Sequence, residues 1–210
     1  MPDPCPLTAF ARVFLAPLCP AVKAVFKKSF RVSAFGIENV PEGAFILASN
    51  HRSYLDPPVL VSVLPRRVFF IAKEELFRGA FGRVLPHLGA LPIKRGGADI
   101  RALYRALEIL KTGCGVGIFP EGTRATDGFL EPKPGVGLLA VKSLAPVLPA
   151  CIKGTDIVLP RGKKFPVPKA RIYVRFGKPS VFQGMDEPKV YKEVAKEVME
   201  SIVKLCNEMD

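Results

Sequence analysis

Histidines and paired cysteines are scarce in this chain of 210 residues. It contains two histidines and five cysteines, and no two cysteines form a C-x-x-C pair. Zinc sites need clustered ligands and disulfide frameworks need an even set of cysteines, so we expect neither, nor any other metal or prosthetic group. Unpaired cysteines fit a reducing cytosol. The five are Cys5, Cys19, Cys114, Cys151 and Cys206.

The chain also lacks an uncharged apolar run long enough to cross a membrane, which takes about 20 residues. Its most apolar N-terminal stretch is VFLAPLCPAVKAVF, where Pro17, Pro20 and Lys23 interrupt the run. A cleaved signal peptide is not expected either, because Asp3 stands where such peptides are basic. Residues 7–30 are typical of one broken or two short helices, which either pack on the domain or lie in a membrane interface between basic flanks.

Acidic residues are outnumbered, with 19 Asp and Glu against 31 Lys and Arg, which gives a formal net charge of +12. This surplus predicts an anionic partner, and the charge alone leaves open nucleic acid, a phosphorylated small molecule or an acidic lipid surface. Hydrophobic residues make up 49% of the chain, enough for a sizeable core. No linker divides the chain, so we expect one domain over residues 31–210, preceded by an apolar and basic helical segment over residues 1–30.

Short apolar runs alternate with helix-like runs, which predicts an α/β fold with a central, mostly parallel or mixed sheet flanked by helices. The strand-like runs are mostly continuous, as in strands that are covered on both faces. They span residues 44–48, 67–72, 90–93, 115–119, 145–152 and 171–176. Helices are predicted at residues 74–88, 98–113 and 135–144 and from Asp186 to the C-terminus.

Two of the predicted helices carry apolar stripes. In the last one, Asp186 is the expected cap and Pro188 suits the first turn. Before the last predicted strand, residues 160–171 (PRGKKFPVPKAR) form a basic, proline-rich loop. The stripes consist of Ile100, Leu103, Leu107 and Leu110 in one helix and of Val190, Val194, Val198, Ile202 and Leu205 in the other.

One histidine follows the predicted strand 44–48, in the stretch NHRSYLDP at residues 50–57. Open α/β sheets bind ligands at this end of their strands. A turn can fold the Asp56 carboxylate back onto the His51 ring, which would make a general-base dyad; the alternative is a loop histidine beside an N-capping aspartate. The sequence has no G-x-S-x-G nucleophile motif, and Ser53 sits in the turn, where serines bond backbone. The dyad would therefore activate a substrate hydroxyl or water.

Charged residues also follow three other predicted strands. In FPEGTR, Gly122 lets the backbone approach a ligand and Arg124 can bind a phosphate through two hydrogen bonds. Glu121 can accept a bond from a substrate hydroxyl or orient Arg124. In GALPIKRGG, Arg95 precedes a helix start, which is a ready anion site, and Lys73 follows another strand. Solvated charged turns are the plain alternative at each position, but together these residues predict a base beside a phosphate-binding pocket.

These stretches resemble the sequence blocks of the glycerolipid acyltransferase family. NHRSYLDP is similar to its first block, N-H-x4-D, and GALPIKR to its second. FPEGTR is similar to the third block and the proline-centred APVLPACIKGT to the fourth. The order and spacing of the blocks also match, over roughly residues 30–180. The resemblance implies transfer of a fatty acyl group to a lipid acceptor.

The resemblance implies a role for each matching residue. His51 would take the proton from the free hydroxyl of the acceptor, and Asp56 would orient His51 and stabilise its charged form. The hydroxyl would attack the thioester of an acyl-CoA or acyl-carrier protein directly, and backbone N–H groups near the third block would hold the developing oxyanion. The residues matched to the acceptor's glycerol phosphate are Arg95, Glu121, Gly122 and Arg124, and further candidates are Lys73, Lys133, Asn50 and Ser53.

The acceptor that the resemblance implies is lysophosphatidic acid, whose sn-2 hydroxyl would be acylated to give phosphatidic acid. Many relatives have long N-terminal membrane spans, which we do not expect here. Because the implied acceptor is a lipid, we expect residues 7–30 to lie in a membrane interface. The expected location is therefore monotopic, on the cytoplasmic face of an anionic membrane. Ala125 departs from the family, where serine often follows the arginine, and this would change a supporting hydrogen bond only.

Three alternatives remain open from the sequence. The acceptor could instead be glycerol 3-phosphate or another lysophospholipid, because the blocks do not separate these. The same base could activate water in a hydrolase. A protein without enzymatic activity could bind anionic membranes or nucleic acid through its charge. Nucleic acid is not expected, since the sequence has no aromatic-studded basic motif and no zinc-finger spacing.

Overall fold

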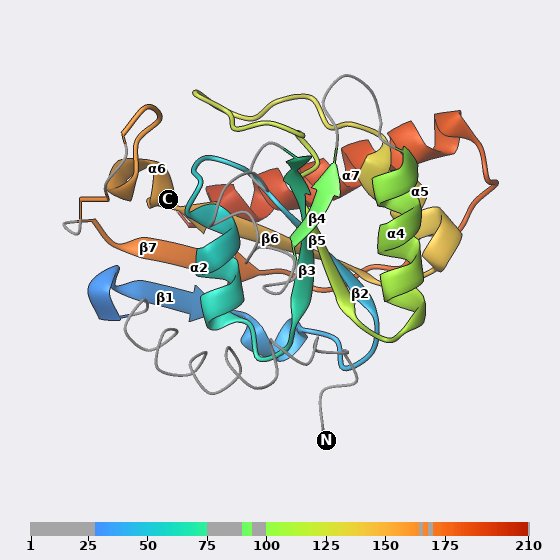
Figure 1. The fold of residues 1–210 in the computed structure, drawn as a ribbon, viewed down its shortest axis with the longest axis horizontal. Coiled ribbons are helices and arrows are strands. Elements are labelled where there is room, and N and C mark those ends of the chain that lie inside the picture. Colours follow the sequence, from blue (N-terminus) through green and yellow to red (C-terminus); the bar gives the residue numbers. More distant parts are fainter. Residues whose placement is uncertain (1–27, 75–89, 94–99, 164–165, 168–169, 210) are drawn as a thin grey trace.

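A seven-stranded sheet forms the centre of the computed structural model, which describes residues 28–74, 90–93, 100–163, 166–167 and 170–209 (Figure 1). The order across the sheet is β1-β7-β6-β2-β5-β3-β4. All neighbouring pairs are parallel except β6 and β7, so the predicted mixed sheet is confirmed. The strands are β1 (Val32–Phe35), β2 (Phe45–Ser49), β3 (Val68–Lys73), β4 (Ala90–Ile93), β5 (Gly115–Ile118), β6 (Val147–Lys153) and β7 (Ile172–Phe176).

Helices cover both faces of the sheet. On one face, α4, α5 and α7 form a buried cluster with Ile46 and Ala48 of β2. On the other face, α2 and α6 contribute to a second cluster with Phe45 and Leu47 of the same strand. All five residues of β2 are buried, which explains why its sequence is a continuous apolar run. The helices are η2 (Ile37–Asn39), α2 (Asp56–Val63), α4 (Ile100–Lys111), α5 (Gly135–Ser143), α6 (Thr155–Val158) and α7 (Pro188–Asn207).

The sequence patterns do not predict β1. This strand pairs only with β7 at one edge of the sheet, and of its four residues only Val32 is buried. A half-exposed edge strand has neither a continuous apolar run nor a clear alternation, so its sequence VSAF carries little signal. The short helix α6 is also absent from the prediction, because four residues are too few to show a helical period.

Two details of the predicted helices are wrong. The N-cap position of α7 is Glu187, which makes no side-chain cap bond. The predicted cap, Asp186, instead forms an ion pair with Lys142 of α5 at 2.5 Å, which draws its carboxylate away from the helix N–H groups. Pro188 does begin the helix. In α4, Ile100 is exposed at the first position, whereas the other three residues of its stripe are buried.

Two predicted segments lie outside the described residues except at their ends, namely the helix at 74–88 and the N-terminal segment at 7–30. In the part of the chain that the structure describes, no helix combines the length and apolar character needed to cross a bilayer. The strands β2, β5 and β6 are parallel neighbours, so the loops after them meet at one edge of the sheet.

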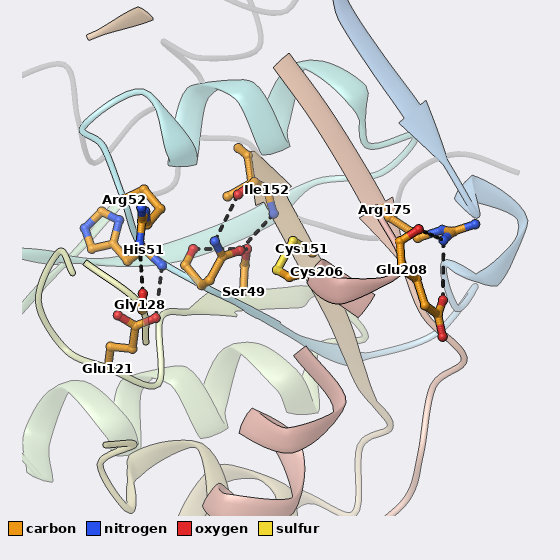
Figure 2. The surroundings of a disulfide bond; sticks show 11 residues. Ser49, His51, Arg52, Glu121, Gly128, Cys151, Ile152, Arg175, Cys206 and Glu208 are labelled. Carbon is orange, nitrogen blue, oxygen red and sulfur yellow. Dashed lines mark hydrogen bonds and ion pairs between the residues drawn. A yellow bond between two sulfur atoms is a disulfide. The ribbon is translucent and has the colours of Figure 1, made fainter. Parts of the chain in front are cut away.

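Cys151 and Cys206 form a disulfide that joins β6 to α7, so the prediction of unpaired cysteines is wrong (Figure 2). Their Cα atoms lie 5.3 Å apart although 55 residues separate them in the sequence. Spacing rules detect cysteines that are close in sequence, whereas packing of α7 on the sheet brings this pair together. Cys114 is disulfide-bonded as well. The cysteines therefore do not support a reducing compartment, and the location stays a prediction.

Candidate active site

His51 and Asp56 form the predicted pair directly after β2. The Nδ1 atom of His51 lies 2.8 Å from Oδ2 of Asp56, whose side chain is fully buried, while that of His51 is 16% exposed. An ionised carboxylate only accepts hydrogen bonds, so Nδ1 carries the proton and the lone pair of Nε2 is left for another partner. The turn thus builds the geometry of a general base, and His51 is not an isolated loop histidine.

Asp56 receives four hydrogen bonds inside the protein. Besides His51, its Oδ2 atom accepts the backbone N–H groups of Arg52 at 2.7 Å and Ser53 at 2.8 Å. Its Oδ1 atom accepts the hydroxyl of Thr155, the first residue of α6, at 2.5 Å. These donors compensate the burial of the carboxylate and fix its orientation toward His51.

Thr155 is a site residue that the sequence reasoning missed. It is fully buried, and 99 residues separate it from Asp56 in the sequence. No spacing rule connects positions so far apart. The signal that could have found it is its place at the end of the fourth block, APVLPACIKGT, directly after the strand that neighbours β2.

The side chains of Asn50 and Ser53 brace the loop that carries His51. The Asn50 side chain donates to the carbonyl of Ile152 at 2.9 Å and accepts the N–H of the same residue at 2.8 Å, which ties the end of β2 to β6. The Ser53 hydroxyl donates to the carbonyl of Leu159 at 3.0 Å, as expected for a serine that bonds backbone. Both side chains are buried. Their polar atoms are used in hydrogen bonds within the protein, and a contact of either side chain with the substrate stays a prediction.

An aromatic side chain covers one face of the His51 ring. Phe119, which follows β5, stacks on the imidazole with ring centroids 4.1 Å apart and an angle of 19° between the planes. Phe70 of β3 stacks in turn on Phe119, with centroids 5.8 Å apart. This packing restricts rotation of the imidazole and keeps water from that face. The sequence did not single out either phenylalanine, since an apolar residue at a strand end is ordinary core.

Glu121 lies buried beside the same loop. It is 2% exposed, and its Oε1 atom accepts the backbone N–H of His51 at 3.4 Å (Figure 2). Its Oε2 atom is buried and has no hydrogen-bond partner among the described residues. Burial raises the pKa of Glu121 from 4.5 to about 7, against the lowering effect of the N–H groups of His51 and Leu130 and of the Arg52 charge. A buried carboxylate oxygen without a partner is a candidate contact for a substrate hydroxyl.

Gly122 and Lys133 lie against each other next to Glu121. Gly122 has a φ of +68°, a conformation that favours glycine, and a Cβ atom there would lie 2.9 Å from Cδ and Cε of Lys133. The Lys133 side chain therefore crosses the Gly122 backbone. The N–H of Lys133 also donates to the carbonyl of Pro120 at 2.8 Å. The structure thus brings the predicted cation Lys133 to the FPEGTR segment.

Arg124 lies over the ring of Tyr54, with its guanidinium carbon 3.7 Å from the ring centroid. Tyr54 belongs to the same loop as His51, and the N–H of Ala125 donates to the His51 carbonyl at 2.8 Å. These contacts join the FPEGTR segment to the loop that carries the base. Arg124 and the pair of His51 and Asp56 therefore lie on adjoining segments, while their roles stay predictions.

Arg52 links the same loop to two others. Its Nη1 atom donates to the carbonyl of Gly128 at 2.8 Å (Figure 2). Its Nη2 atom lies 3.3 Å from Oδ2 of Asp156. Gly128 follows β5 and Asp156 belongs to α6. The guanidinium therefore holds together the three loops that surround the dyad, a role that the sequence did not reveal.

Comparisons with known proteins identify the family. The family model described as Acyltransferase matches residues 31–153, which is more than half of the chain. The 1-acyl-sn-glycerol-3-phosphate acyltransferase of Bacillus subtilis (strain 168) is 31% identical over 137 residues, which cover 64% of this chain and 68% of that protein. The chain belongs to the acyltransferase family.

Other relatives of this acyltransferase are longer. The chloroplastic 1-acyl-sn-glycerol-3-phosphate acyltransferase BAT2 of Brassica napus is 35% identical over 141 residues, which cover 64% of this chain and 41% of the plant protein. The match to the chloroplastic relative LPAT1 of Arabidopsis thaliana covers 39% of its length, so the chain spans about two fifths of these plant proteins. The crystal structure of the 1-acyl-sn-glycerophosphate (LPA) acyltransferase PlsC from Thermotoga maritima superimposes with a TM-score of 0.72 and 26% identity, covering 93% of this chain and 85% of that one.

Several predictions for this acyltransferase stay untested by its structure. Arg95 lies outside the described residues, and Lys73 is described only as the last residue of β3. The backbone N–H groups of Gly122, Ala125 and Lys133 already donate to carbonyls, so these three are not the expected oxyanion donors. Within the described ranges, no group of three or more His, Cys, Asp or Glu side chains could hold a metal ion.

Proposed function

We propose that this acyltransferase moves a fatty acyl group from acyl-CoA or acyl-carrier protein to the sn-2 hydroxyl of lysophosphatidic acid, giving phosphatidic acid. The observation that carries the proposal is the hydrogen bond between His51 and the buried Asp56, which leaves Nε2 of the ring for the acceptor. The activities named for the relatives from Bacillus subtilis and Thermotoga maritima support the choice of acceptor.

In the proposed reaction, Nε2 of His51 takes the proton of the acceptor hydroxyl as the hydroxyl oxygen attacks the carbonyl carbon of the thioester. The C–O bond of the new ester forms, and the C–S bond breaks when the tetrahedral intermediate collapses. The proton on His51 passes to the departing thiolate, so a free thiol is released and the base is restored. Asp56 stabilises the imidazolium between these steps. The reaction uses no cofactor and no covalent acyl-enzyme.

The glycerol phosphate of the acceptor would bind on the segment after β5. Arg124 and Lys133 supply positive charge for the phosphate, and Arg124 can bind it through two parallel hydrogen bonds. The Oε2 atom of Glu121 is buried without a partner in the described part of the chain, so it can accept a bond from a glycerol hydroxyl. Arg95 is the further cation that the resemblance assigns to this phosphate.

The proposal includes a monotopic position on the cytoplasmic face of an anionic membrane. The acceptor is a lipid, and the net charge of +12 suits an anionic surface. Residues 1–30, which are apolar and basic in sequence, are the proposed N-terminal contact. The partners of the enzyme are then the lysophospholipid, the acyl donor and the lipid surface, without nucleic acid.

Thiol release tests the proposal. Palmitoyl-CoA and palmitoyl-acyl-carrier protein are each supplied with and without lysophosphatidic acid in detergent. We expect release that depends on the acceptor and that falls by about 10³-fold or more in His51→Ala. Release that needs no acceptor would assign a hydrolase, and a preference for glycerol 3-phosphate or lysophosphatidylcholine would change the acceptor. No release with either donor, from folded protein, would overturn the enzymatic function.

A further inference from the structure

The segment after β6 exposes apolar side chains next to the candidate active site. Ile157 in α6 is 66% exposed and Val167 is 48% exposed. The N–H of Val167 donates to the carbonyl of Val158 at 2.7 Å, so the chain returns to α6 after a short excursion. Thr155 and Val158 face inward and are fully buried, which leaves Ile157 on the outer side of the helix.

The same segment is positively charged. From Ile157 to Arg171 the sequence contains no Asp or Glu. Arg161, Lys163 and Arg171 are exposed, and none of the three forms an ion pair with a carboxylate of the described residues. We refer to the described residues of this stretch, 157–163, 166–167 and 170–171, as the α6 loop. It combines exposed apolar side chains with unpaired cations, a combination that a solvated loop does not require.

The α6 loop lies close to the dyad, because α6 and the residue after it contact the loop that carries His51 and Asp56. Thr155 donates to Asp56, Asp156 pairs with Arg52, and the carbonyl of Leu159 accepts the Ser53 hydroxyl. Figure 1 shows α6 beside the loop that connects β2 to α2, with the chain after α6 projecting outward. A surface that engages the α6 loop therefore also lies close to His51.

Two backbone contacts connect the α6 loop to its surroundings. Gly154 has a φ of +89°, and a Cβ atom there would lie 2.2 Å from the Arg171 carbonyl oxygen, which is too close for a side chain, so the backbone at the start of α6 lies against the residue before β7. Together with the bond between Val167 and Val158, this contact joins the described parts of the α6 loop to α6.

We propose that the α6 loop binds the surface of an anionic lipid bilayer and thereby holds the active site at the membrane that supplies the acceptor. Ile157 and Val167 would enter the interface, and Arg161, Lys163 and Arg171 would meet the anionic headgroups. Nucleic acid would use the cations but would not need the two aliphatic side chains. This inference rests on the proposed function for its purpose, and it is a second lipid contact besides residues 1–30.

Vesicle binding by the full chain tests the proposal. Cosedimentation is measured with vesicles of phosphatidylcholine alone and with vesicles that also contain phosphatidylglycerol. Arg161→Glu combined with Lys163→Glu is expected to weaken binding to the anionic vesicles by about tenfold or more. Ile157→Ser combined with Val167→Ser is expected to weaken it several-fold.

Matched controls come from the other end of β6. Met185, which is 67% exposed, follows the bridge between Ser180 and Val147 at the amino end of that strand, and Lys189 and Lys192 lie in the exposed start of α7. Away from the α6 loop, Met185→Ser makes one change of the same kind in polarity, and the pair Lys189→Glu with Lys192→Glu makes the same change in charge. Vesicle binding of these controls is expected to stay within twofold of wild type.

Activity separates this inference from the proposed function. With monomeric acceptor in detergent, the α6 loop variants should keep wild-type rates, whereas their rates on acceptor embedded in anionic vesicles should fall with binding. Unchanged vesicle binding in both α6 loop variants would overturn the inference. Loss of binding to a single-stranded oligonucleotide without loss of vesicle binding would assign the α6 loop to nucleic acid instead. Wild-type protein without activity in detergent would contradict the proposed function alone, since vesicle binding would still decide the role of the α6 loop.

Discussion

The loop after β2 and the loop after β5 meet at His51, but they differ in how completely their polar groups are paired. In the first loop, both oxygens of Asp56 are used by four donors, and the carboxylate is fully buried. In the second, Oε2 of Glu121 has no partner within the described residues, and the guanidinium of Arg124 lies over the face of an exposed tyrosine.

This difference separates two tasks of one site. A base that must be ready for every turnover benefits from groups that are already oriented, so its hydrogen bonds are complete without substrate. A binding surface keeps polar groups without partners, which raises their free energy until a ligand supplies the missing bonds. Burial raises the pKa of Glu121 to about 7, which shows that the hydrogen bonds of the carboxylate do not fully compensate its removal from water. Changes to the first loop should therefore lower kcat, and changes to the second should act on acceptor binding and on stability.

The largest expected effect comes from Asp56→Asn. The substitution removes the charge that stabilises the imidazolium and can offer an N–H where His51 needs an acceptor, so kcat should fall by about 10³-fold to 10⁴-fold. Steady-state kinetics with lysophosphatidic acid measure the loss, and thermal unfolding checks that the variant is folded. A variant that keeps a tenth of the wild-type kcat would show that the pairing has no catalytic role.

Glu121→Gln should change the pH dependence of stability. Because the pKa of Glu121 is raised to about 7 in the fold, ionising it opposes folding, so this residue lowers stability as pH rises from 4.5 through 7. At about 1.4 kcal/mol per pKa unit, the full penalty above pH 7 is about 3 kcal/mol. Urea unfolding should therefore find the variant equal to wild type at pH 4 and more stable at pH 8. The matched control is Glu131→Gln, which changes an exposed carboxylate of the same loop. If the stability of Glu121→Gln fell with rising pH as steeply as that of wild type, the raised pKa of Glu121 would be refuted.

Thr155→Val should lower kcat by about tenfold to 100-fold, because a buried oxygen of Asp56 loses its donor and the carboxylate is less firmly oriented. The KM for acceptor and donor should not change, since Thr155 acts through Asp56. Thr155→Ser keeps the hydroxyl and should restore most of the rate, which a purely structural role would not require. Thr112→Val, at the other end of the strands, is the control. A rise in KM at constant kcat would place Thr155 in substrate binding instead.

The smallest effect is expected at the pair of Arg124 and Tyr54. Arg124→Ala should raise the KM for lysophosphatidic acid by about tenfold with little change in kcat, because it removes a phosphate contact. Tyr54→Leu should raise the same KM by about threefold through loss of the stacked ring that orients the guanidinium. Tyr104→Leu, an exposed tyrosine of α4, is the control for the second change. Equal KM values in all four proteins would remove Arg124 from the acceptor site.

The parts of the fold and site that the sequence predicts are those with a local signal. The continuous run of β2 marks a strand covered on both faces, and the short spacing of His51 and Asp56 lets one turn join them. Contacts between distant segments carry no such signal. The bond of Thr155 to Asp56, the stacking of Phe119 on His51 and the disulfide of Cys151 with Cys206 all depend on which strands are neighbours, which the sequence alone does not reveal.

A double-mutant cycle tests the central claim, that His51 and Asp56 act together as one general base. It compares kcat for wild type, His51→Ala, Asp56→Asn and the protein with both changes, at saturating acceptor and donor. If the two residues form one unit, the double variant should be no slower than His51→Ala, because Asp56 works only through the imidazole. Losses that multiply, so that the double variant is slower than His51→Ala by the full Asp56→Asn factor, would show that the two side chains act independently and would contradict the account.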